Sequence, residues 1–231
     1  MDKLSKPPLN LVTLRVEFPH NLKVSEHRSE YYEKIKTDFP QVIFPEKQSL
    51  TYDFSDCHFR NSESTTQIRI ATNYFVVETV KYDKVDNFWV LFDKVFSQFK
   101  TCFNIENVTT LRLSYDNFIK IEKGISSANF SDYFSLGVSF REQKERKFLT
   151  LNGSVFFAIE NGILQISINP KQNQETLIWD ALEFKIDCQM NKNVNLDGTL
   201  GTLKTEFDIA HRNIEDMFVS SLAEQYFQSI K

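Results

Sequence analysis

The stretch at residues 200–230, LGTLKTEFDIAHRNIEDMFVSSLAEQYFQSI, decides the fold because it is predicted to form one long amphipathic helix. Steps of three and four residues place its apolar side chains on one face of a 3.6-period helix. These side chains are Leu203, Phe207, Ala210, Ile214, Met217, Phe218 and Leu222. Another element must cover that face, and the chain upstream is rich in alternating strand patterns. We therefore expect this helix to lie across a sheet.

One polar residue interrupts the apolar stripe of this helix. His211 lies four residues after Phe207 and three before Ile214, so its imidazole is predicted to point at or beside the sheet. Because an unpaired buried polar group costs roughly 1 to 3 kcal/mol, we expect His211 to be hydrogen-bonded to a strand backbone or to a side chain of the second sheet. An acid or base role would need a carboxylate or nucleophile beside it. We interpret His211 as a structural polar residue.

Residues 1–124 are predicted to form an α+β half with the order strand, helix, three strands, helix, strand. Ser25 is expected to cap the first helix, and Pro40 ends it. The second helix begins at Asp83 and carries a wide aromatic stripe, which we assign to the core. A turn or bulge is expected at Asp116-Asn117. The predicted strands cover residues 9–18, 50–54, 66–71, 74–82 and 109–115.

Residues 125–231 are predicted to form an antiparallel sheet followed by the long helix. Asn161-Gly162 is expected to supply two positive φ angles to a two-residue hairpin turn, and Pro170 to end the strand after it. The predicted strands cover residues 134–140, 148–159, 163–168 and 179–190. The fold class is thus α+β: antiparallel-rich sheets with helices packed on one side and a long C-terminal helix. The two halves are either separate domains divided near residues 124–131 or one continuous domain.

Composition and motifs exclude several functions. The chain of 231 residues has only 6 glycines and contains neither G-x-G-x-x-G nor G-x-x-x-x-G-K-[ST], so a phosphate-cradling loop is not expected. The net charge is −4, and no apolar run approaches the length of a membrane span. The N-terminus does not look like a signal peptide, and Cys57, Cys102 and Cys188 are far apart. We expect a cytoplasmic protein with reduced thiols and no membrane association.

Catalytic and metal motifs are also absent from the sequence. G-x-S-x-G does not occur, and the adjacent residues Cys57 and His58 would point to opposite faces of an extended segment. The four histidines show no H-x-x-x-H spacing, so neither a metal site nor a cofactor is predicted. Acidic residues could in principle hold a divalent ion, although a solvated sheet face shows the same pattern. They are Asp53 with Asp56, and Asp180 with Glu183 and Asp187.

Three segments together resemble a known family. They are L-V-T-L-R-V-E-F at residues 11–18, R-L-S-Y-D-N-F at residues 112–118, and the helix from Phe207 to Phe218 that contains His211. The family is an uncharacterised, sporadically distributed prokaryotic family of cytoplasmic proteins of about 250 residues. The resemblance carries over no catalytic residue, and Phe118 stands where the family commonly has an aliphatic side chain. Patchy distribution implies an accessory system such as antiviral defence.

We therefore predict a non-enzymatic interaction or sensor subunit of an accessory system. The first alternative is a metal-assisted phosphodiesterase or nuclease that uses strand carboxylates. The second is a nucleotide or nucleic-acid binding module that uses arginines and exposed aromatic rings. The candidate binding residues are Arg112, Tyr115, Asn117, Arg141 and Arg146.

Self-association is a further expectation from the sequence. The predicted terminal helix is longer than a four-stranded sheet is wide, so its far end would overhang the sheet. The apolar residues there would need cover from a second copy. They are Leu222, Tyr226, Phe227 and Ile230.

Overall fold

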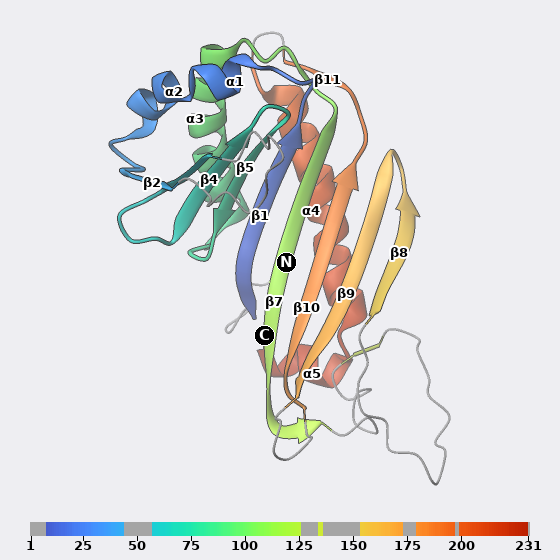
Figure 1. Cartoon of the computed structure of the whole chain (residues 1–231). Coiled ribbons are helices and arrows are strands. Elements are labelled where there is room, and N and C mark those ends of the chain that lie inside the picture. Colours follow the sequence, from blue (N-terminus) through green and yellow to red (C-terminus); the bar gives the residue numbers. More distant parts are fainter. Residues whose placement is uncertain are drawn as a thin grey trace, which may run out of the picture.

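The computed structural model describes residues 8–43, 57–125, 134–135, 153–172, 179–196 and 199–230. These residues form a large antiparallel sheet with helices packed on one of its faces (Figure 1). The arrangement confirms the predicted α+β class with a helix near the C-terminus. The sheet face opposite the helices, which carries Arg112, Ser114 and Asp187, is called the open face below.

Within the described residues the large sheet has nine strands in the order β2-β3-β4-β5-β1-β7-β10-β9-β8. They are β1 (Leu9–Glu17), β2 (Gln41–Ile43), β3 (Cys57–Arg60), β4 (Thr66–Ala71), β5 (Tyr74–Thr79), β7 (Thr110–Ile125), β8 (Gly153–Ile159), β9 (Gly162–Gln172) and β10 (Trp179–Met190). A small second sheet joins β6 (Asn107–Val108) to β11 (Val194–Asn195). Alternation of apolar and polar residues in β1, β7 and β10 buries one side of each strand.

The described helices are α1 (Lys23–Glu26), α2 (Arg28–Ile35), α3 (Val85–Phe103), α4 (Gly201–Ser221) and α5 (Glu224–Ile230). α3 and α4 lie behind the sheet in Figure 1. The predicted stripe of α3 also included Val85, which is only partly buried, and it is confirmed for its other seven members. These are buried: Phe88, Trp89, Phe92, Val95, Phe96, Phe99 and Phe103. The ring of Trp89 lies 5.0 Å from that of Phe207 on α4, so the two helices share one apolar layer.

The two halves of the chain follow a similar plan and meet at the centre of the sheet. β1 pairs with β7, for example Leu14 with Leu113. In the first half the strands β2 to β5 follow one another outside β1, β5 pairs with β1, and α3 comes next in the chain. In the second half the strands β8 to β10 follow one another outside β7, β10 pairs with β7, and α4 comes after them in the chain. The strands therefore form one continuous sheet across the two halves.

The prediction of one unbroken helix over residues 200–230 is wrong beyond Ser221. Leu222 has extended backbone with ψ of 142° and forms a β-bridge with Phe134, and α5 begins only at Glu224. The amide of Ser135 donates a hydrogen bond to the carbonyl of Ser221. This tertiary pairing overrides the local preference for helix. Leu222 is buried, so it does not belong to an overhanging apolar end.

Two predicted strand boundaries in the sheet are also wrong. β7 continues without a turn through Asp116 and Asn117, because it is paired with neighbouring strands on both sides there. The predicted turn is therefore wrong, but a bulge-like irregularity does occur in the ladder at these residues: Leu9 pairs with Asn117 and Leu11 with Asp116, so the extra residue belongs to β1. β9 continues through Pro170, which is buried opposite Leu182 of β10.

The start of the first helical region differs from its prediction, whereas the hairpin at residues 66–79 is confirmed. Ser25 lies inside α1 and its hydroxyl donates to the carbonyl of Leu22, so it is not an N-cap.

β4 and β5 form the predicted hairpin. The short strands β2 and β3 were not predicted. The strand predicted at 50–54, most of the one at 134–140, and residues 148–152 lie outside the described residues.

Candidate functional site

β8 is an edge strand of the sheet, and within the described residues it pairs only with β9 (Figure 1). The hairpin between them turns at Asn161, whose φ of 58° is a conformation that asparagine tolerates. Gly162 serves a different purpose from the one expected. A Cβ at Gly162 would overlap the carbonyl oxygen of Gln189, so glycine allows β9 to approach β10 closely. The turn therefore fixes β8 against β9, and the strand order places β8 at the rim.

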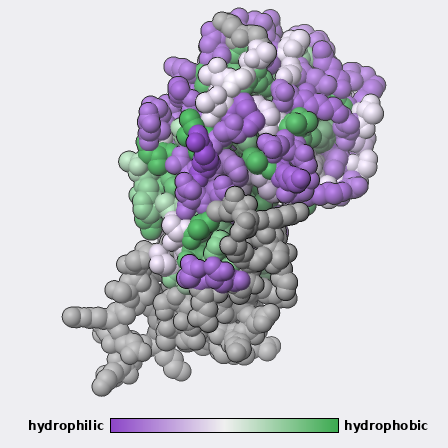
Figure 2. Space-filling view, turned by 180° about the vertical axis from the view of Figure 1, so that it is seen from behind, coloured by the Kyte–Doolittle hydropathy of each residue, from purple (hydrophilic) through white to green (hydrophobic). Residues whose placement is uncertain are grey.

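β8 carries exposed apolar side chains on both faces of the sheet. Val155 and Phe157 lie on the helix-side face and are 45% and 39% exposed, whereas Phe156 on the open face is 64% exposed. Ile163 of β9 adjoins Phe156 on the open face and is 44% exposed. Within the described residues these four make up half of the exposed large hydrophobic side chains. Figure 2, the view from the helix side, shows hydrophobic residues gathered at the left margin, where β8 and β9 lie.

The outer edge of β8 offers backbone hydrogen-bonding groups. In a two-residue hairpin the pair that flanks the turn, here Ile159 and Gly162, exchanges both backbone hydrogen bonds, and the pattern then alternates along the ladder. The N–H and C=O groups of Ser154, Phe156 and Ala158 consequently point away from β9. Natural edge strands usually carry charges, prolines or bulges that discourage pairing. β8, G-S-V-F-F-A-I, carries no charge and no proline.

The side chain of His211 belongs to a chain of polar contacts beneath the helices. The hydroxyl of Tyr115 and Nδ1 of His211 are hydrogen-bonded at 3.0 Å, and the hydroxyls of Tyr115 and Tyr82 at 2.9 Å. His211 also stacks on Phe207 with an interplanar angle of 13°. The hydrogen bond expected of His211 is therefore made to a strand side chain. That strand, β7, begins in the first half of the chain and not in the second.

Burial keeps the members of this polar chain uncharged near neutral pH. Burial raises the pKa of Tyr115 far above its ordinary value and also raises the pKa of Tyr82. Burial lowers the pKa of His211, against the opposing effect of the nearby Glu215. A neutral histidine between a tyrosine and a phenylalanine ring holds α4 on the sheet. The arrangement lacks a nucleophile activated by this histidine.

Arg112 and Asp187 form an ion pair on the open face. Nε of Arg112 lies 2.7 Å from both carboxylate oxygens of Asp187, and Nη2 lies 2.7 Å from Oδ2. The hydroxyl of Ser114 donates to Oδ2 at 2.7 Å. The Asp187 side chain is only 5% exposed, whereas that of Arg112 is 43% exposed. The hydrogen bonds to Asp187 raise the pKa of Arg112. This arginine neutralises a buried carboxylate.

The structure separates the binding residues predicted from the sequence. Arg112 lies on the open face, whereas Tyr115 and Asn117 point to the helix side. Asn117 is buried and its amide donates to the carbonyl of Phe184 at 3.1 Å. Arg141 and Arg146 lie outside the described residues. The three described residues do not converge on one surface.

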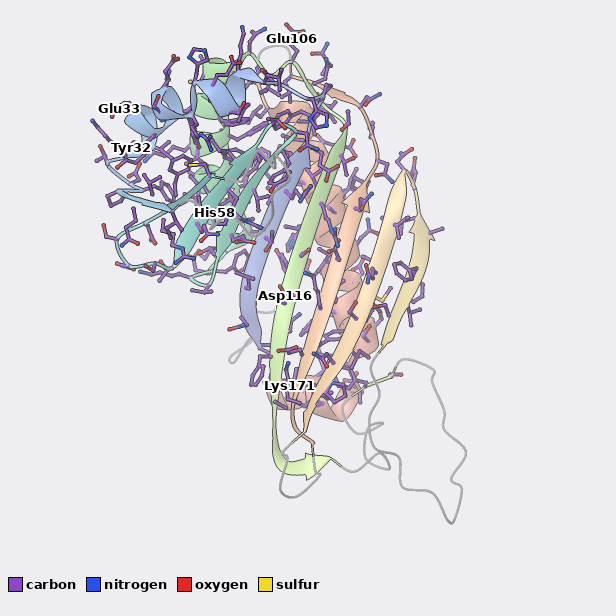
Figure 3. All side chains as sticks on the ribbon, in the orientation of Figure 1. Tyr32, Glu33, His58, Glu106, Asp116 and Lys171 are labelled. Carbon is purple, nitrogen blue, oxygen red and sulfur yellow. The ribbon has the colours of Figure 1, made fainter. Side chains whose placement is uncertain are left out.

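The acidic residues considered as metal ligands have other partners or lie outside the described part. Asp53 and Asp56 are outside it. Glu183 pairs with Lys171 at 3.0 Å and accepts a hydrogen bond from Asn169 at 2.8 Å. Across the described ranges, no group of three or more His, Cys, Asp or Glu side chains is placed to hold a metal ion. Asp116 on the neighbouring strand and Lys171 are marked in Figure 3.

A cavity of about 390 Å³ lies between the β3–β4 turn, the end of β5 and the start of α3. Tyr82 lines it, so the polar chain to His211 begins at its wall. Its charged groups are paired: Lys81 contacts Glu63 at 3.2 Å, and Asp83 accepts a hydrogen bond from Asn87 at 2.6 Å. That hydrogen bond lowers the pKa of Asp83. Three charged groups in the wall, those of Glu63, Lys81 and Asp83, are thus engaged with other lining residues.

The two buried thiols, Cys57 and Cys188, are not arranged for reactivity. Burial raises the pKa of Cys57 to about 11 and that of Cys188 to about 12, so both remain protonated thiols at neutral pH. Cys57 and His58 lie in β3, where neighbouring side chains point to opposite faces, as predicted. His58 lies on the open face (Figure 3). These geometries do not form a thiolate and imidazole pair.

Comparison with known proteins does not assign a function. No family model matches the chain, and no curated protein is similar to it. In the part of the chain that the structure describes, the helices are too short or too polar to cross a lipid bilayer. The apolar edge strand β8 was not singled out from the sequence. The signal for it is the uncharged run G-S-V-F-F-A-I directly before the hairpin turn.

Proposed function

We propose that the protein is a non-enzymatic interaction subunit that binds a protein partner by addition of a strand to β8. The observation that carries this proposal is the exposed apolar edge: Phe156 is 64% exposed in the middle of an uncharged edge strand. In strand addition, main-chain hydrogen bonds supply much of the affinity, and alternating side chains supply specificity. β8 offers both kinds of contact.

The polar residues of the protein support an interaction role and not catalysis. His211 is neutral and stacked, and Tyr115 is a protonated hydroxyl between two hydrogen-bond partners. Arg112 is engaged with the buried Asp187. Each group is therefore engaged in holding the fold together. The rim at β8 and β9 groups four of the eight exposed large hydrophobic side chains of the described residues, and internal packing does not explain it.

Selection from a library of random extended peptides tests the proposal. Wild-type protein is expected to enrich peptides with alternating apolar residues, and Phe156→Asp is expected to weaken their binding at least tenfold. A charge in the middle of the edge would have to be desolvated on pairing, which explains the direction. The matched control is Val90→Asp, because Val90 is 65% exposed on the surface of α3.

Two results would contradict the proposal. The first is that no peptide is enriched, or that the enriched peptides bind Phe156→Asp and wild type equally. The second is an enzymatic turnover that disappears when one carboxylate or His211 is replaced while the fold stays intact. The second result would favour the phosphodiesterase or nuclease alternative.

A further inference from the structure

We infer that the partner of β8 is a second copy of this chain, joined by antiparallel pairing of β8 with itself about a two-fold axis at Phe156. This inference rests on the proposed function and names the partner. Identical strands in antiparallel pairing form an isologous interface, the commonest kind in soluble oligomers. The axis would stand perpendicular to the sheet, so the helices of both copies would cover the same side.

The backbone of β8 fits this pairing without a shift in register. With the axis at Phe156, the outward groups of Phe156 face those of the second copy's Phe156. The outward groups of Ser154 face those of the second copy's Ala158, and the outward groups of Ala158 face those of the second copy's Ser154. Ser154, Phe156 and Ala158 are the residues whose N–H and C=O groups point away from β9. Each outward group thus meets a complementary one.

The side chains fit the same register. Val155 would lie opposite the second copy's Phe157 in a non-hydrogen-bonded pair, where side chains pack most closely. Both are partly exposed on the helix-side face. The two Phe156 rings would meet on the open face beside the exposed Ile163. Aromatic and β-branched pairs of this kind stabilise neighbouring strands. One contact would cover apolar surface on both faces of the rim.

Charge distribution allows two copies to pair at β8. β8 carries no charged residue, so self-pairing sets no like charges opposite each other. Glu160, the next residue after β8, would lie eight residues away from the second copy's Glu160 in this register, or ~27 Å at ~3.4 Å per residue. That distance exceeds the screening length of about 8 Å at physiological salt. The net charge of −4 per chain therefore opposes pairing only weakly.

The dimer surface differs from the one that the helix pattern predicts. The bridge to Phe134 buries Leu222, and Tyr226 and Phe227 on α5 are only partly exposed. The predicted overhang therefore loses Leu222, the first of its four apolar residues. A single strand pair is smaller than a standard interface of roughly 1,600 Å², so we expect weak and reversible pairing.

Cysteine cross-linking in the full chain tests both the pairing and its register. The background carries Cys102→Ser, because Cys102 is partly exposed whereas Cys57 and Cys188 are buried. Phe156→Cys is expected to form a disulfide dimer with itself, since hydrogen-bonded pairs have Cα atoms about 5.5 Å apart. Val155→Cys and Phe157→Cys are each expected to cross-link poorly alone and well when mixed.

Ile163→Cys is the matched control for these variants. Ile163 is exposed on the adjacent strand β9. In the proposed dimer the two Ile163 residues lie about three strand spacings apart across the sheet and about four residues apart along the strands, or roughly 20 Å in all. Ile163→Cys should not form the disulfide at a rate above that of random collision. Light scattering of wild type from 1 to 300 µM should show a rising mean mass, and Phe156→Asp should remain monomeric.

The outcomes separate this inference from the proposed function. A constant monomer mass together with equal cross-linking of the Phe156→Cys and Ile163→Cys variants overturns self-pairing. If that monomer still enriches strand-forming peptides through β8, the proposed function stands. If amide exchange shows the Phe156 N–H to be protected in dilute monomer, its own chain already covers the edge and both proposals fail.

Discussion

Replacement of Arg112 by alanine is expected to destabilise the fold, although the sequence placed Arg112 among the candidate binding residues. Asp187 is 5% exposed and would keep only the hydroxyl of Ser114 as a partner among its present side-chain contacts. Removing one member of a fully buried ion pair costs roughly 3 to 5 kcal/mol. Arg112 is 43% exposed, so water can replace part of its contact. We therefore expect a loss of about 2 kcal/mol.

Asp187→Ala is expected to cost less than Arg112→Ala. The freed guanidinium of Arg112 can be hydrated because it reaches solvent, whereas Ser114 is left as a buried hydroxyl without its acceptor. We expect about 1 kcal/mol for this variant. The double variant should cost less than the sum of the two, because neither charge is then left without a partner. The order of the costs follows from the unequal exposure of the partners.

Urea unfolding followed by tryptophan fluorescence measures these differences. Lys171→Ala is the control on the same face, since both side chains of the Lys171–Glu183 pair are about half exposed and such pairs contribute under about 1 kcal/mol. Equal costs for Arg112→Ala and Lys171→Ala would refute the reasoning. So would strict additivity of the Arg112 and Asp187 substitutions.

Three further substitutions test the interior. Tyr115→Phe removes the hydroxyl that is hydrogen-bonded to Tyr82 and His211, and it should lower the free energy of unfolding, measured in urea, by about 1 to 2 kcal/mol. A negligible change would show that these two hydrogen bonds do not stabilise the fold. Burial lowers the pKa of His211 in the folded protein below that in the unfolded chain. As the pH drops below about 6.5, His211 therefore becomes protonated in the unfolded chain before it does in the folded protein, and the free energy of unfolding should fall. His211→Gln should show a shallower fall in urea midpoint between pH 7.5 and 5, and parallel curves would contradict this assignment. Gly162→Ala forces a Cβ against the carbonyl of Gln189 and should lower the melting temperature by roughly 5 °C or more, whereas Gly153→Ala, which meets open space, should not.

Several elements follow from local pattern alone. The apolar periodicity of α3 predicts which face of the helix is buried, because seven aromatic and aliphatic residues recur at helical spacing. The alternation in β10 and the Asn161 turn likewise predict a strand and a hairpin. The alternation in β7 also places Arg112 and Tyr115 on opposite faces, which argues against a shared site for them. These features depend on residues within a few positions of one another.

Other features depend on contacts between distant residues, so local pattern does not predict them. Ser221 ends α4 because Leu222 pairs with Phe134, more than eighty residues away. Arg112 is structural because Asp187, on a strand of the other half, is buried beneath it. β8 becomes an edge because the chain order places β9 and β10 between it and β7. The free energy that selects among strand orders comes from burial and pairing across the whole sheet. The amino-acid sequence by itself therefore determined the periodic segments, such as α3, the β4–β5 hairpin and β10, because their pattern is local. Tertiary pairing decided where α4 ends and which strand carries the exposed edge.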